Sequence, residues 1–132
     1  MARYRQETPT EVEMEILQVL WDRESATVRE VVDVLNQTRI RAYTSILSML
    51  NVMLEKGLVV REDQSRAHVY RAKKTREKTL GRVVKELLGR AFQGSANSLI
   101  TQVLEQSKPS AKEFEEIRKS IERWQKQEKR DG

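Results

Sequence analysis

Four side chains that could contact nucleic-acid bases recur at helical spacing near the middle of the chain. They are Thr44, Leu47, Ser48 and Asn51, at positions i, i+3, i+4 and i+7. A solvated helix face usually carries charged side chains, whereas these are short and neutral. Such a face suits a DNA major groove, where asparagine pairs with adenine and leucine contacts a thymine methyl group. Close packing against another helix would also account for small residues, so this segment alone leaves both interpretations open.

The apolar residues of the same segment predict the helix that positions this face. They follow the i, i+3, i+4, i+7, i+8 pattern of a helix with one buried side, at Ile46, Met49, Leu50, Met53 and Leu54. Gly57 stands where helices commonly end in a left-handed cap. We therefore expect a helix over Tyr43 to Lys56.

Positive charge is concentrated around this helix. Residues 39–90 hold 13 Lys or Arg against 5 Asp or Glu, whereas residues 1–38 hold 4 against 8. A basic block of this kind favours a polyanionic partner. A basic segment that serves only solubility is the alternative.

The segments on either side complete a winged helix-turn-helix. Thr10 with Glu13 and Thr27 with Glu30 have the spacing of capping boxes, which predict two helices joined at residues 24–26. Two β-prone runs at 58–62 and 67–71 predict a hairpin with Arg66 at its tip. A hairpin directly after the third helix is a wing. The single histidine, on this hairpin, is expected to be an ordinary surface or half-buried residue.

The C-terminal part is predicted to be three helices, which are too thin a core for a free-standing unit. Their apolar residues are expected to pack against a second copy of the chain, although packing back onto the winged domain would also bury them. The predicted dimerisation residues are Leu80, Val83, Val84, Leu87, Leu88, Phe92, Leu99, Val103, Phe114, Ile117, Ile121 and Trp124.

Composition argues against several classes of protein. The chain has no cysteine and one histidine, so no disulfide, metal site or nucleophile–base pair of the usual kinds is expected, and no cofactor or enzymatic activity is predicted. No apolar run approaches the roughly 20 residues that span a bilayer. We expect a soluble protein of the cytoplasm without membrane insertion.

Several motifs, taken in order, resemble the BlaI/MecI family of penicillinase repressors. The resemblance extends from about Thr10 to Trp124, and the motifs that carry it are Thr10-x-x-Glu13 with Leu20-Trp21, Tyr43-Thr44-Ser45-Ile46, Leu50-Asn51, Glu55-Lys56-Gly57-Leu58-Val59, Arg66-Ala67-His68-Val69-Tyr70, Phe92-x-Gly94-Ser95, and Glu113 with Ile117-Arg118.

The resemblance implies a mainly α fold, with a winged-helix DNA-binding domain over residues 1–73 and a helical dimerisation domain over residues 74–132. It implies a homodimer that binds a palindromic operator and represses transcription. Within the recognition helix, Thr44, Ser45 and Ser48 match positions that face DNA in the family, and Arg66 matches the wing.

Two departures from the family concern induction. Members that control β-lactam resistance are cleaved at an Asn-Phe bond after a membrane sensor is triggered, but the matching positions here are Gln102-Val103. Copper-responsive relatives carry C-terminal cysteines, and this chain has none. The signal therefore stays open, as does an upstream sensor or protease as a further partner. Leu47 also replaces a basic residue of well-known members.

The sequence thus predicts which residues contact DNA. Base contacts are expected from the recognition helix, and phosphate contacts from cations near it. The predicted DNA-binding residues are Arg39, Arg41, Tyr43, Thr44, Ser45, Leu47, Ser48, Asn51, Lys56 and Arg66. The alternative function is a winged-helix adaptor whose basic block binds an acidic protein, since the fold supports both.

Overall fold

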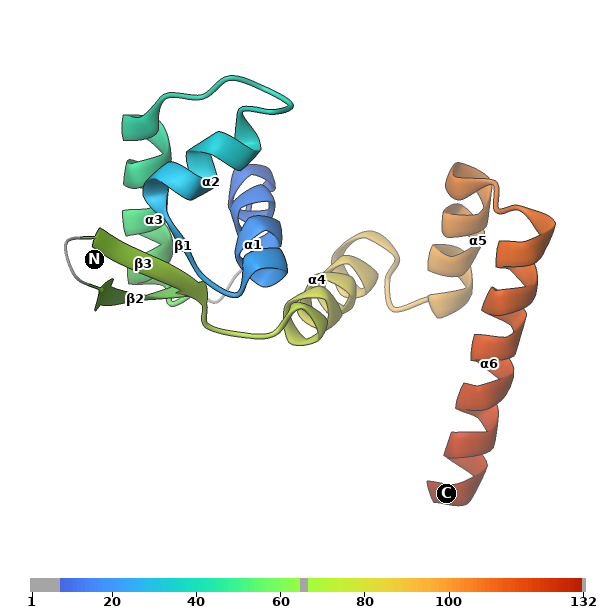
Figure 1. Cartoon of the computed structure of the whole chain (residues 1–132). Helices are drawn as coiled ribbons and strands as arrows, with labels where there is room; N and C mark the ends of the chain where they lie inside the picture. The colour runs from blue at the N-terminus through green and yellow to red at the C-terminus, as the bar shows by residue number, and fades with distance from the viewer. Residues whose placement is uncertain (1–7, 65–66, 132) are drawn as a thin grey trace. The chain divides into compact units, whose positions relative to one another are not determined.

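The computed structural model describes residues 8–64 and 67–131, and its N-terminal half is a winged helix-turn-helix (Figure 1). The elements are α1 (Glu11–Arg23), β1 (Ala26–Thr27), α2 (Val28–Leu35), α3 (Tyr43–Lys56), β2 (Val59–Gln64), β3 (Ala67–Ala72), α4 (Arg76–Ala91), α5 (Ala96–Ser107) and α6 (Ala111–Asp131). The predicted fold class, mainly α with a small β wing and further helices, is confirmed.

Both predicted capping boxes begin a helix. The Thr10 hydroxyl accepts a hydrogen bond from the backbone N–H of Glu13 at 3.3 Å, and the Thr10 N–H donates to the Glu13 carboxylate at 2.9 Å. Thr27 and Glu30 repeat this arrangement at 3.2 and 2.8 Å. Because the first turn of a helix leaves its N–H groups unpaired, these reciprocal bonds fix where α1 and α2 begin.

The wing is part of a three-stranded antiparallel sheet in the order β1-β3-β2. The hairpin of β2 and β3 was predicted, but β1 was not, because two residues are too few to show a strand period. Ala26 pairs with Tyr70 and is buried, so the segment expected to be a plain connection adds the third strand.

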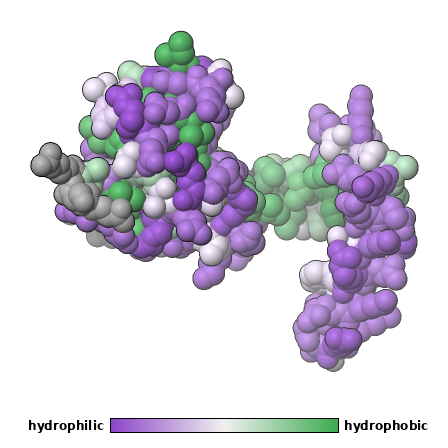
Figure 2. Space-filling view, in the orientation of Figure 1, coloured by the Kyte–Doolittle hydropathy of each residue, from purple (hydrophilic) through white to green (hydrophobic). Residues whose placement is uncertain are grey.

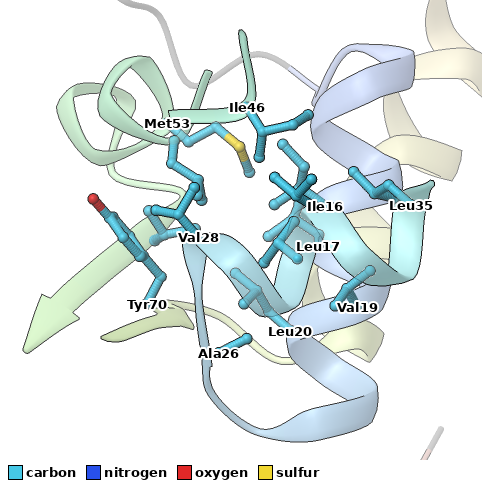
Figure 3. Close-up of a cluster of buried hydrophobic side chains, with 14 residues drawn as sticks. Ile16, Leu17, Val19, Leu20, Ala26, Val28, Leu35, Ile46, Met53 and Tyr70 are labelled. Carbon is cyan, nitrogen blue, oxygen red and sulfur yellow. The ribbon is translucent and has the colours of Figure 1, made fainter. Parts of the chain in front are cut away.

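One side of α3 forms part of the core of the winged domain. Ile46, Leu50 and Met53 are at most 1% exposed and pack among buried side chains of α1, α2 and β3 (Figure 3). Burying an aliphatic side chain of this size contributes about 1.5–3 kcal/mol. Gly57 then ends α3 in the left-handed conformation (φ 79°), as predicted. The core therefore fixes which side of α3 faces outward.

The chain divides into two compact units, of which the first ends at Leu87 and the second begins at Leu88. Most of α4 thus belongs with the winged domain, whereas the sequence placed the boundary after residue 73. A contact supports this assignment, because the indole N–H of Trp21 donates to the backbone carbonyl of Lys74 at 3.0 Å. Trp21 is half-buried, packs against the core cluster and ties α1 to the segment before α4.

The second unit contains two amphipathic helices joined by a short turn. Gly94 (φ 81°) makes the turn after α4, and the Ser95 hydroxyl caps α5 by accepting from the N–H of Ser98 at 3.1 Å. Over their described residues, α5 and α6 contain no buried side chain. Figure 2 shows hydrophobic surface over the C-terminal part of α4 and a mainly hydrophilic surface over α6 on the face in view.

Candidate nucleic-acid interface

The outward side of α3 presents Thr44, Ser48 and Asn51 in one line along the helix, with Ser45 beside them. All four side chains are exposed, and within the described ranges none of their hydroxyl or amide groups forms a hydrogen bond. Because α3 is anchored by its opposite side, these donors and acceptors are held on a rigid element. We call these four residues the polar face of α3. Its groups match those that bind base edges in a major groove.

Leu47 is less exposed than the sequence predicted for a residue on the polar face of α3. It is half-buried and packs against the core cluster. The reason is its position three residues before Leu50 and seven before Leu54, which places it on their stripe of the helix. The expectation that Leu47 lies on the exposed polar side is therefore corrected.

A buried ion pair holds the C-terminal end of α3. The Lys56 ammonium lies 2.8 Å from Glu13 Oε2, and the Glu13 side chain is 1% exposed. The other carboxylate oxygen of Glu13 accepts the N–H of Thr10, so one side chain caps α1 and binds α3. This ion pair gives Lys56 a role inside the domain, which weighs against its predicted phosphate contact.

A second ion pair holds the loop before α3. Arg41, whose side chain is 10% exposed, lies 2.8 Å from Glu15 Oε2. The hydrogen bond from Arg41 lowers the pKa of Glu15 below its ordinary value of 4.5, which indicates that the contact favours the charged carboxylate. The Arg41 backbone N–H also donates to the side chain of Asn36 at 2.7 Å. Arg41 thus anchors the entry to α3, and its phosphate contact stays a prediction.

Other cations near α3 remain available for phosphates. Arg39 and Arg61 are exposed, and within the described part of the chain neither forms an ion pair. On the wing, Arg71 pairs with Glu62 at 2.8 Å, and His68 pairs with Asp63 across the strands. His68 is exposed, as expected. The predicted wing residue Arg66 lies outside the described residues.

Arg29 of α2 was missed by the sequence analysis. Its guanidinium lies over the ring of Tyr43, the first residue of α3, with 4.8 Å between the guanidinium carbon and the ring centroid. Tyr43 itself is 39% exposed. One feature of the sequence could have identified Arg29. It lies between Thr27 and Glu30 of the second capping box, in the first turn of α2, where its side chain is expected to point away from the core.

None of the predicted dimerisation residues is fully buried in the single chain. The exposed ones are Leu80, Val84, Leu87, Val103, Phe114, Ile121 and Trp124, and the half-buried ones are Val83, Leu88, Phe92, Leu99 and Ile117. Ile100 is also exposed and was not predicted. Gln102 and Val103, at the expected cleavage position, are both exposed within α5.

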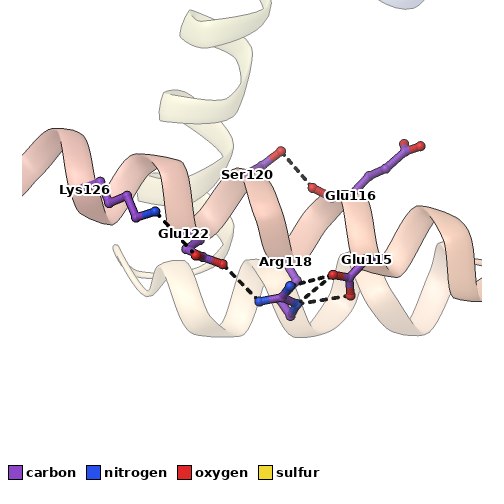
Figure 4. Close-up of polar contacts among 6 residues, drawn as sticks. All are labelled: Glu115, Glu116, Arg118, Ser120, Glu122 and Lys126. Atoms are coloured by element: carbon purple, nitrogen blue, oxygen red, sulfur yellow. Dashed lines mark hydrogen bonds and ion pairs between the residues drawn. The ribbon is translucent and has the colours of Figure 1, made fainter.

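Two cations of α6 form ion pairs with glutamates of the same helix. Arg118 binds Glu115 and Glu122, and Lys126 lies 3.6 Å from the second of these (Figure 4). The hydrogen bonds that Arg118 donates to Glu115 lower the pKa of that carboxyl group and raise the pKa of the Arg118 guanidinium. Because Arg118 and Lys126 are paired with carboxylates of their own helix, these two cations contribute little attraction for a polyanion.

Two further searches of the described residues found nothing that changes this picture. No described helix combines the length and apolarity needed to cross a membrane. No group of three or more His, Asp or Glu residues is arranged to hold a metal ion in the described part of the chain.

Comparison with known proteins gave consistent matches. The family model described as penicillinase repressor matches residues 9–123. The penicillinase repressor of Bacillus licheniformis is 24% identical over 120 residues, covering 91% of this chain and 94% of that protein. A solution structure of monomeric Bacillus licheniformis BlaI in complex with the blaP half-operator is similar at 23% identity. The match has a TM-score of 0.48 and covers 55% of this chain and 89% of that one.

We expect Lys56→Ala to lower the free energy of unfolding by about 3 kcal/mol, because it leaves the buried Glu13 carboxylate without its cation. Arg23→Ala is the matched control. Arg23 binds the other capping-box glutamate, Glu30, at the same 2.8 Å, but those side chains are 45% and 43% exposed. An exposed pair contributes at most about 1 kcal/mol. Urea denaturation measures both variants, and equal losses would contradict the importance of burial.

Proposed function

This chain belongs to the penicillinase repressor family of DNA-binding transcriptional regulators, and we propose that it represses transcription as a homodimer bound to a palindromic operator. The observation that carries the proposal is the polar face of α3, whose hydrogen-bonding groups are exposed and uncommitted within the described residues. Such a face carries the donors and acceptors that bind base edges in a major groove. Repression of this kind takes place in the cytoplasm.

Base readout is assigned to the polar face. Asn51 can pair with the N6 and N7 positions of adenine, and the hydroxyls of Thr44 and Ser48 can donate to or accept from either base of a pair. In helix-turn-helix proteins the N-terminal residues of the second helix contact base edges. Thr44 and Ser45 lie in the first turn of α3 and are placed for this role.

Phosphate binding is assigned to two cations that form no ion pair among the described residues and to the predicted wing residue Arg66, which lies outside them. Arg39 precedes the helix and Arg61 lies on β2, and Arg66 supplies the tip of the wing in this proposal. Contacts of this kind increase affinity and salt dependence but carry no sequence information. Specificity therefore rests on the polar face of α3.

Dimerisation is assigned to the C-terminal helices. On α6, Phe114, Ile117, Ile121 and Trp124 are spaced by three, four and three residues, which is the a and d pattern of helices that pair. Phe114, Ile121 and Trp124 are 47–65% exposed in the single chain. A second copy of the same surface would cover them. Two recognition helices would then enter successive major grooves about 34 Å apart.

We expect Asn51→Ala to change sequence preference rather than affinity alone. Loss of the paired amide should cost about 1–3 kcal/mol on the preferred sequence and much less on variants that lack the matching adenine. Binding to a panel of single-base operator variants measures this effect. Asn97→Ala, at an exposed asparagine of α5, is the control. An equal loss of affinity on every sequence would remove Asn51 from base readout.

The dimer proposal predicts that Ile121→Asp converts the protein to a monomer at micromolar concentration while its helix content is retained. Ile121 is 47% exposed in the single chain, so the substitution should not unfold it. Gln127→Asp adds the same charge to α6 outside the apolar stripe and should leave the dimer intact. Sedimentation equilibrium distinguishes the two states. A wild-type monomer over the same concentrations would refute the proposal.

A further inference from the structure

Arg29 connects α2 to the first residue of the recognition helix. Its guanidinium stacks over the Tyr43 ring at 4.8 Å, and its contact with Asp33, at 4.0 Å between Nη1 and Oδ1, is long and exposed. Exposed pairs of this kind contribute little. The contact with the ring is the one that links this guanidinium to α3.

Stacking leaves the donors of an arginine available. A guanidinium that lies face-on to an aromatic ring keeps its N–H groups at its edge, in the plane that binds a phosphate with two hydrogen bonds. The Arg29 side chain is 64% exposed, so these donors are accessible to an outside ligand. The site thus combines a fixed orientation with an open edge.

The position of the pair relates it to the polar face. Tyr43 directly precedes Thr44 and Ser45, at the end of α3 that enters the groove in helix-turn-helix proteins. In such proteins the helix before the recognition helix crosses the DNA backbone. Arg29 is carried by that helix, α2.

We propose that Arg29 binds a phosphodiester of the DNA backbone at the edge of the groove occupied by α3, and that Tyr43 is the platform that orients its guanidinium. This inference rests on the proposed function and adds a residue to it. It also changes the role of Tyr43, which acts through Arg29 in addition to any contact of its own. The count of charges missed this cation because residues 1–38 are acidic overall.

The test is the salt dependence of operator binding by the full-length protein. Each phosphate contact adds about 0.9 to the slope of log K against log salt, so Arg29→Gln should lower the slope by about 0.9 for each bound protomer. Near physiological salt, the loss of this one phosphate contact corresponds to about fivefold weaker binding for each protomer. The loss should be the same on preferred and non-preferred sequences. Arg29→Lys keeps the charge but cannot bind phosphate with the planar two-bond geometry, so it should retain most of the slope while weakening affinity.

Further substitutions distinguish phosphate binding by Arg29 from a general loss of positive charge and from a loss of packing around Tyr43. Arg123→Ala removes one positive charge from exposed α6 and should leave the slope unchanged. Tyr43→Leu removes the aromatic platform while Tyr43→Phe keeps it, so only the leucine variant should weaken binding. Combined with Arg29→Gln, Tyr43→Leu should cost less than the sum of the two single effects.

The outcomes distinguish this inference from the function on which it rests. If the wild-type protein selects no sequence, the proposed function fails. If it selects an operator but Arg29→Gln keeps the wild-type slope, only the Arg29 assignment fails. A slope lowered equally by Arg29→Gln and Arg29→Lys would also overturn it, because the packing and not the charge would then be responsible.

Discussion

The buried ion pair between Glu13 and Lys56 is the interaction on which the geometry of the recognition helix depends. Glu13 caps the start of α1 with one oxygen and binds the end of α3 with the other, while Arg41 and Glu15 hold the loop that enters α3. Both ends of α3 are therefore tied to α1. Buried pairs gain little net stability over apolar residues but become costly when broken, so they favour one arrangement of the helices.

Fixing α3 in this way divides the cations of the basic block into two groups. Lys56 and Arg41 are used inside the domain, whereas Arg39 and Arg61 form no ion pair in the described part of the chain. A count of charges treats all of them as equal contributors to a polyanion site. The structure uses the first group to orient the helix, and in the proposed function the second group attracts phosphates, so that rigidity and affinity would come from different residues.

The elements of the winged domain could be predicted from the sequence, because each has a strong local signal. Two capping boxes and Gly57 mark the ends of helices, and the apolar spacing of α3 identifies its buried side. What could not be predicted depends on partners far apart in the chain. Lys56 meets Glu13 across 43 residues, β1 has only two residues, and Arg29 finds Tyr43 only after folding. Half-burial of Leu47 likewise follows from packing rather than from composition.

The account can be tested most directly by selecting genomic DNA fragments with the purified protein at low and at physiological salt. We predict enrichment of one palindromic sequence, with half-sites a whole number of helical turns apart, that persists at the higher salt. Such a result requires base readout by two copies of α3. Weak binding to all fragments that disappears at physiological salt would contradict the account, because phosphate attraction alone behaves in that way. The basic block would then be better explained as a surface for an acidic protein partner.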